Sequence, residues 1–164
     1  MSHSHSSPTT YFEDLRVGQR FMSGSLTVTL DEIIAFATQF DPQPFHTDPV
    51  AAEHSIFKGL VASGWHTAAL TMRLFVTSDF NPANGFIGAG VEVLDWPTPV
   101  RSGDTLHVEG EVISLRESKT RPTQGVVVVR SHTLNQRGET VQVLQPKMIV
   151  RKRPTDSSMP TPSP

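Results

Sequence analysis

Alternating and β-branched hydrophobic positions in the second half of the chain predict an antiparallel sheet. Short turns rich in Gly, Pro and Asn join four successive strand-like runs, at residues 86–94, 105–115, 125–134 and 140–151. Strands that follow one another through short turns pair antiparallel. Residues 19–30 are predicted to form an earlier strand, and Gly24 in its irregular middle indicates a bulge.

Hydrophobic residues at helical spacing predict two longer helices and one short helix. The first begins after Thr29, which with Glu32 forms a capping-box pattern, and it ends before Asp41. The short helix is expected at residues 49–56, where a proline occupies the first position. The third helix, at residues 64–76, is apolar around much of its circumference, which is typical of a buried helix. Its apolar residues are Trp65, Ala68, Ala69, Leu70, Met72, Leu74, Phe75 and Val76.

These elements predict an α+β fold in which an antiparallel sheet wraps around one long buried helix. A chain of 164 residues suits a single domain, which we expect at residues 11–152. Residues 1–10 are rich in Ser and His, and residues 153–164 are rich in Pro, Ser and Thr. Neither segment can bury much apolar surface, so both are expected to be disordered tails.

Composition narrows the function classes. With 37% hydrophobic and 18% charged residues and a net charge of -2, the chain lacks the basic patch that a nucleic-acid partner requires. It contains no cysteine, which excludes disulfides, thiolate metal sites and a cysteine nucleophile. No segment is apolar over the roughly 18 residues that a membrane helix needs, so a cytoplasmic protein without a membrane partner is expected.

Residues 40–46, Phe-Asp-Pro-Gln-Pro-Phe-His, form a proline-rich loop that carries a carboxylate and an imidazole. Each proline fixes its own φ and pushes the preceding residue toward extended geometry, so a stiff, non-helical loop is expected. A stiff loop can hold Asp41 and His46 against one small target, such as a water molecule. Taken alone, such residues are more often a turn-forming aspartate and a solvated imidazole.

The chain resembles the MaoC-like acyl dehydratases, which include the R-specific enoyl-CoA hydratases and have the hotdog fold. The resemblance covers about residues 11–152. It rests on Asp41 to His46 followed by Asp48-Pro49, on Leu60-Val61 before Gly64, and on the later turn Asn135-Gln136-Arg137-Gly138-Glu139. It implies a single hotdog domain that forms a homodimer or a higher oligomer and acts in fatty acid metabolism.

The resemblance implies a hydro-lyase that adds or removes water across the 2,3 double bond of an enoyl-CoA. Asp41 and His46 would hold one water between them, and either can be the formal base. The N–H of Gly64, at the start of the third helix, would bind the oxyanion that forms on the thioester carbonyl. The simpler interpretation of Gly64 is close packing of the helix, with Ser63 as a plain N-cap. No metal and no cofactor beyond the coenzyme A of the substrate are implied.

Two residues depart from the family pattern, which commonly has Gly before the aspartate and Asn-Pro two residues after it. Here Phe40 and Gln43 occupy those places, so the wall of the acyl pocket is expected to differ. The residues predicted to contact substrate are Phe40, Gln43, Phe45, Ser63 and Trp65. Trp65, Met72 and Phe75 are first interpreted as core residues, with pocket lining as a second role.

Two alternatives stay open. A hotdog thioesterase would release free thiol, but residues 65–78 offer no Asp or Glu to activate water on the buried helix. A non-catalytic hotdog module would bind acyl groups or assemble with a partner without forming product. His54 and His66 are given no role in any of these readings. The basic end formed by Lys147, Arg151, Lys152 and Arg153 is either a solvated strand end or a contact for the phosphates of coenzyme A.

Overall fold

The structure, a computed structural model, describes residues 9–155 and consists of one curved antiparallel sheet with helices on its inner side. The strands are β1 (Arg20–Thr27), β2 (Ile87–Asp95), β3 (Thr105–Glu117), β4 (Gln124–Leu134) and β5 (Thr140–Arg151), and they lie in the order β1-β3-β4-β5-β2. The predicted strands are all present, with ends that differ by three residues or fewer.

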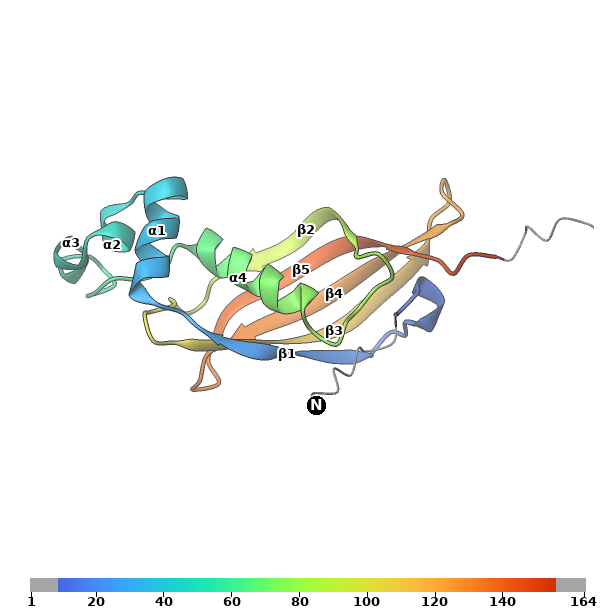
Figure 1. Cartoon of the computed structure of the whole chain (residues 1–164), viewed down its shortest axis with the longest axis horizontal. Helices are drawn as coiled ribbons and strands as arrows, with labels where there is room; N and C mark the ends of the chain where they lie inside the picture. The colour runs from blue at the N-terminus through green and yellow to red at the C-terminus, as the bar shows by residue number, and fades with distance from the viewer. Residues whose placement is uncertain (1–8, 156–164) are drawn as a thin grey trace, which may run out of the picture.

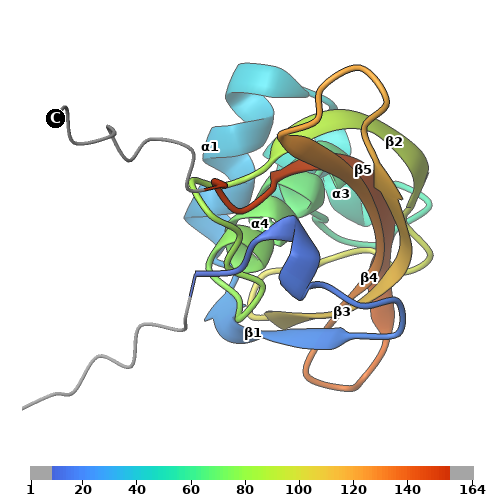
Figure 2. The same cartoon turned by 90° about the vertical axis from the view of Figure 1, so that its right-hand side faces the viewer.

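The sheet curls around α4 (Gly64–Val76), as Figure 2 shows. The remaining helices gather beyond one end of the sheet in Figure 1. They are α1 (Leu30–Phe40), α2 (Pro44–Thr47) and α3 (Pro49–Glu53), and a 3-10 turn, η1 (Phe12–Asp14), precedes β1. The predicted arrangement of sheet and central helix is therefore confirmed.

Local signals account for several element boundaries. Thr29 and Glu32 form the predicted capping box at the start of α1. The register between β1 and β3 shifts between Met22 and Ser25, which is the irregularity expected around Gly24. Asp48 caps α3 by accepting the N–H groups of two residues in its first turn.

One prediction for the proline-rich loop is wrong. The loop is not free of helix, because Pro44 begins the single turn α2, which contains Phe45 and His46. The reason is local: a proline at the first position has a φ suited to a helix, and Gln43 before it keeps an extended ψ of 142°. The prolines thus direct the chain into a turn that the prediction did not include.

The core lies between the sheet and α4. Alternate valines of β3 and β4 point inward, and Phe75 of α4 packs edge-on against Phe21 of β1 with ring centroids 4.9 Å apart. On the opposite side of α4 the prediction of burial is wrong, since Trp65, Met72 and Val76 are exposed to 60%, 38% and 53%. The sheet curls around only one side of the helix, so its apolar outer stripe has no cover within the described residues.

The described part of the chain reaches slightly beyond the predicted domain at both ends. The Thr10 N–H donates to the Asn81 carbonyl, and the Arg153 guanidinium contacts the Asp14 carboxylate at 2.8 Å. The predicted disorder of residues 1–8 and 156–164 concerns residues outside the described range, and the tail boundaries stay predictions.

Candidate active site

Asp41 lies at the point where α1 ends and the proline-rich loop begins. It is the C-cap residue of α1, and its N–H donates to the Ala37 carbonyl, so the helix holds its backbone in place. Two side chains donate hydrogen bonds to its carboxylate: Ser63 Oγ to Oδ2 at 2.7 Å and Gln43 Nε2 to Oδ1 at 2.8 Å. These two hydrogen bonds, with the nearby His46, hold the pKa of Asp41 below its ordinary value, so the carboxylate is ionised.

His46 is buried and its ring is oriented by a backbone carbonyl. Its Nδ1 lies 2.7 Å from the Val61 carbonyl oxygen, which can only accept a hydrogen bond. Nδ1 therefore carries the proton of the neutral ring, and Nε2 presents a lone pair. That Nε2 lies 3.4 Å from Asp41 Oδ2.

Two acceptors therefore face each other at the centre of the site. Neither a carboxylate oxygen nor an unprotonated ring nitrogen can donate to the other. A water molecule, which has two O–H donors, satisfies both groups at once, and protonation of the imidazole is the other way to pair them. This arrangement can hold a water and can accept its proton.

Ser63 joins this pair to the start of α4. It is the N-cap residue, and while its hydroxyl donates to Asp41 it also accepts the N–H of Trp65 at 3.2 Å. The next residue, Gly64, is the first of the helix, so its N–H has no partner within the helix. No hydrogen bond from this N–H is found among residues 9–155. The positive end of the helix dipole lies at the same place.

Gly64 is in contact with an indole ring that the sequence interpretation did not include. A Cβ on Gly64 would lie 2.7 Å from two ring atoms of Trp96, so no larger residue fits without movement of that ring. The Trp96 ring also meets Trp65 edge-on with centroids 5.5 Å apart. Close packing at Gly64 is therefore real, and it is compatible with a role for the N–H.

These groups open into one cavity of about 450 Å³. The lining residues include both members of the Asp/His pair, the first helical residue and a segment after β2: Asp41, Gln43, Phe45, His46, Phe57, Val61, Ala62, Gly64, Trp65, Thr67, Trp96, Pro97, Thr98, Pro99, Val100 and Val141. Six of the eight predicted site residues line the cavity. Ser63 lies behind the wall, bonded to Asp41.

Phe40 is the predicted substrate contact that the structure does not bring to the cavity. Its ring is 63% exposed and packs against Phe36 with centroids 5.0 Å apart. The two phenylalanines are four positions apart and therefore lie on one side of α1, and neither lines the cavity. The expectation that Phe40 forms part of the acyl pocket wall is corrected accordingly.

The segment from Trp96 to Val100 is the part of the site that sequence reasoning missed. It was expected to be only a turn between strands, because two prolines and a glycine mark residues 97–103. A tryptophan next to such a turn was the available signal, since a large aromatic ring in a polar connection usually packs against something.

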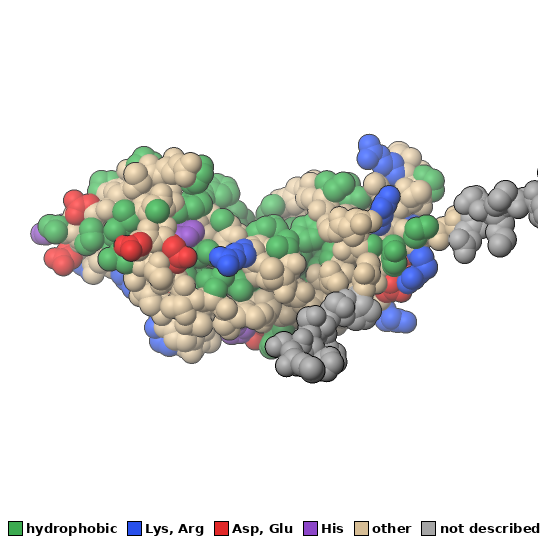
Figure 3. Space-filling view, viewed as in Figure 1, with side chains coloured by type: hydrophobic (Ala, Val, Ile, Leu, Met, Phe, Trp, Pro, Cys, Tyr) green, Lys and Arg blue, Asp and Glu red, His purple; other side chains and the backbone are tan. Residues whose placement is uncertain are grey.

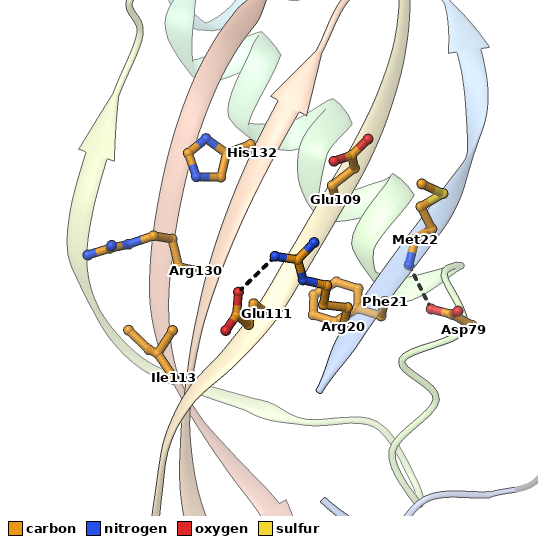
Figure 4. Close-up of a pocket in the computed structure, with 10 residues that line it drawn as sticks. Arg20, Phe21, Met22, Asp79, Glu109, Glu111, Ile113, Arg130 and His132 are labelled. Carbon is orange, nitrogen blue, oxygen red and sulfur yellow. Dashed lines mark hydrogen bonds and ion pairs between the residues drawn. The ribbon is translucent and has the colours of Figure 1, made fainter. Parts of the chain in front are cut away.

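A second hollow, of about 530 Å³, lies across β1, β3 and β4. Figure 4 shows charged side chains there, and several of them are paired: Arg20 contacts Glu111 at 3.8 Å, and Asp79 accepts the N–H of Met22 at 2.9 Å. None of the predicted site residues lines this hollow.

Neither a metal site nor a membrane-spanning helix is found within residues 9–155. They contain no group of three or more His, Cys, Asp or Glu side chains placed to hold a metal ion. None of their helices combines the length and the hydropathy that crossing a membrane requires.

Comparison with known proteins agrees with this geometry. The sequence model of the MaoC like domain matches residues 15–135. The chain belongs to this family. A MaoC-like dehydratase from Rhodospirillum rubrum has a solved structure that is 55% identical, with a TM-score of 0.85 over 89% of this chain and 99% of that chain. The family and the hotdog fold that the sequence predicted are thus confirmed.

Two curated relatives are named hydratases. The (R)-specific enoyl-CoA hydratase of Rhodospirillum rubrum is 33% identical over 117 residues, 66% of this chain and 74% of that protein. The mesaconyl-CoA hydratase of Cereibacter sphaeroides is 45% identical over 68 residues, which are 42% of this chain and 20% of that protein. At the level of the family, these similarities support hydration of an enoyl-CoA.

Proposed function

We propose that the protein is an enoyl-CoA hydratase that adds water across, or removes it from, the 2,3 double bond of an acyl-CoA. One observation carries the proposal: Asp41 Oδ2 and His46 Nε2 face each other at 3.4 Å on the wall of the cavity that also contains the free N–H of Gly64. The cavity thus offers a place for a water and a donor for a thioester oxygen. This chemistry needs no cofactor besides the coenzyme A of the substrate.

In the proposed mechanism, Asp41 and His46 both bind and activate one water molecule. An imidazole is ordinarily a stronger base than a carboxylate, and the hydrogen bonds of Ser63 and Gln43 lower the pKa of Asp41 further. We therefore assign proton acceptance to His46 Nε2 and orientation of the water to Asp41. As the water oxygen bonds to C3, its proton moves to His46, and the Asp41 carboxylate stabilises the imidazolium.

The electron pair of the double bond moves onto the thioester carbonyl, which becomes an enolate oxygen. The Gly64 N–H and the positive end of α4 would stabilise this charge. The imidazolium then returns a proton to C2, which restores the neutral ring and completes the addition of water. Dehydration follows the same steps in reverse.

The proposed enzyme is a homodimer. Strand β2 is an edge of the sheet, and its Ile87 and Val91 side chains are more than half exposed. Figure 3 shows hydrophobic side chains along the region where α4 lies in Figure 1, and Met72 and Val76 of α4 are exposed too. A second copy that paired through β2 would continue the sheet and cover this stripe. Because acyl-CoA is an intracellular substrate, we place the enzyme in the cytoplasm and in fatty acid metabolism.

The test is a spectrophotometric assay with crotonyl-CoA. Loss of the conjugated enoyl absorbance without release of free thiol is expected for the wild-type protein. Free thiol in place of hydration would indicate a thioesterase, and binding without any product would indicate a non-catalytic acyl-binding module. Either outcome would refute the proposal.

A further inference from the structure

Gln142 is a fully buried polar residue directly behind the cavity wall. The register between β4 and β5 shifts here, since Thr133 pairs with Gln142 and Leu134 with Thr140. Such a bulge gives the strand one extra residue and redirects its side chains. As a result both Val141, which lines the cavity, and Gln142 are completely buried.

In the side-chain amide of Gln142 the oxygen is hydrogen-bonded, whereas the nitrogen is not. Its Oε1 accepts a hydrogen bond of 2.7 Å from Trp96 Nε1, which can only donate, so the orientation of the amide is fixed. Its Nε2 is buried and has no partner among the described residues. A buried donor without an acceptor has lost its hydration without a replacement hydrogen bond, which destabilises the fold. A group that supplied an acceptor would remove this cost.

The surroundings of Gln142 are polar but carry no positive charge. Thr67 lines the cavity, and Thr71 of α4 bonds Thr133 of β4 through their hydroxyls at 2.7 Å, with both residues fully buried. The bonded pair occupies the space between α4 and β4, which we expect to limit the length of the acyl chain. No Lys or Arg lines the cavity, whereas Asp41 contributes a negative charge, so a carboxylate on the acyl group would be repelled.

We propose that the acyl end of this site accepts a short acyl group that carries an uncharged oxygen, such as a hydroxyl or a keto group, and that Gln142 Nε2 donates to this oxygen. Trp96 forms the gate: its ring lies on Gly64, is 40% exposed and follows the edge strand β2. We infer that a rotation of the indole about its hydrogen bond to Gln142 admits the acyl group to Nε2. This inference rests on the proposed function and adds the substrate class.

The first experiment compares substrates on the wild-type enzyme. The values of kcat/KM are measured for crotonyl-CoA, 4-hydroxycrotonyl-CoA, fumaryl-CoA and octenoyl-CoA. The hydroxylated substrate is expected to exceed crotonyl-CoA on the order of tenfold, since a site built to donate to an oxygen discriminates against an analogue without it. Fumaryl-CoA and octenoyl-CoA are expected to be poorer than crotonyl-CoA. Equal values for the first two substrates, or a preference for the carboxylate or the long chain, would overturn the inference.

The second experiment tests the residues. Gln142→Met keeps the approximate shape but removes the donor, so the ratio of kcat/KM between the hydroxylated and plain substrates should fall to about one. Gln145→Met is the matched control, because Gln145 lies on the same strand but bonds Arg130 and Glu92, and it should keep the wild-type ratio. Trp96→Ala should raise the relative rate with octenoyl-CoA. A Gln142→Met enzyme with the wild-type ratio would show that the amide is only structural.

Binding separates this inference from the proposed function. Calorimetric titration of the wild-type protein with butyryl-CoA, 4-hydroxybutyryl-CoA and octanoyl-CoA requires no turnover. If no enoyl thioester is hydrated but the hydroxylated ligand still binds on the order of tenfold more tightly, the proposed reaction fails and the inferred acyl specificity stands. Hydration of crotonyl-CoA together with equal binding of all three ligands overturns the specificity and leaves the reaction intact.

Discussion

Along the first two turns of helix α4 the two sides reverse the usual distribution of polar and apolar residues, whereas Leu74 and Phe75 in its last turn bury apolar side chains in the core. Toward the sheet it presents Thr67 and Thr71, following the buried N-cap Ser63, all hydroxyl side chains with exposures of 2% or less. Away from the sheet it presents Trp65 and Met72, large apolar side chains exposed to 60% and 38%. Buried polar groups and exposed apolar groups are the informative exceptions in a soluble protein.

The contacts of each side explain which residues it carries. On the inner side Ser63 bonds Asp41, and Thr71 bonds Thr133, so the hydroxyls are satisfied within the site and beneath it. On the outer side nothing within the described residues covers the stripe, although such a surface is typical of a protein interface. The inner side therefore belongs to the proposed chemistry and the outer side to the proposed dimer.

Among changes within helix α4, the largest effect is expected at Gly64, its first residue. Gly64→Pro removes the N–H, and a proline fits the first helical position because Ser63 already has an extended ψ of 141°. The added ring needs space, so the variant is made in a Trp96→Ala background. Its matched control is Gly64→Ala in the same background, which keeps the N–H.

The proline variant is expected to hydrate crotonyl-CoA about 10²- to 10³-fold more slowly than the alanine control, the usual loss for one oxyanion donor. The comparison uses kcat at saturating substrate. Equal rates in the two variants would reduce Gly64 to a packing role.

The outer side is tested by adding charge to it. Met72→Lys with Val76→Lys should convert the dimer to a monomer, since burying unpaired ammonium groups weakens association by about 3 kcal/mol or more. Sedimentation equilibrium measures the change. Gln39→Lys, on the exposed surface of α1, is the control and should remain dimeric. A wild-type protein that is already monomeric at assay concentrations would contradict the role given to this stripe.

A smaller effect is expected from the hydroxyl pair beneath the helix. Thr71→Val should lower the free energy of unfolding by about 1–3 kcal/mol, because Thr133 then keeps a buried hydroxyl without its partner. The double variant Thr71→Val/Thr133→Val should recover most of this loss. Urea denaturation gives both values, and a double variant less stable than the single one would indicate that the hydroxyls do not act as a pair.

The smallest effect is a dependence of stability on pH. Burial lowers the pKa of His66, which stacks on Phe36, and the Glu32 carboxylate opposes this shift less strongly. Below about pH 6.5 the unfolded chain binds a proton that the folded chain does not, so stability falls as the pH decreases through that window. His66→Leu should flatten the curve of unfolding free energy below about pH 6.5. An unchanged slope in His66→Leu would rule out this source.

Local signals in the sequence were sufficient for most of the fold and for half of the site. Several of these signals act within a few residues, so a pattern in the sequence reveals them. They are the prolines around Gln43, the cap at Ser63 and the capping box at Thr29. The proximity of Asp41 and His46 is local in the same way, because the short loop keeps the two residues together, whereas their role was predicted from the family resemblance.

The missed features depend on contacts between distant positions. Trp96 meets Gly64 and Gln142 only because β2 pairs with β5 at the edge of the sheet. Nor could hydrophobic periodicity identify the exposed stripe of α4, since an exposed apolar residue and a core residue follow the same pattern along a helix. These features required the three-dimensional arrangement.

The most direct test of the account is a double-mutant cycle on kcat/KM for crotonyl-CoA with Asp41→Asn and His46→Gln. If the two residues act on one water, each single change should reduce the value by about 10²- to 10⁴-fold, and the double variant should lose little more than the worse single variant. Losses that multiply in the double variant, or wild-type turnover in either single variant, would contradict the claim that Asp41 and His46 share one water.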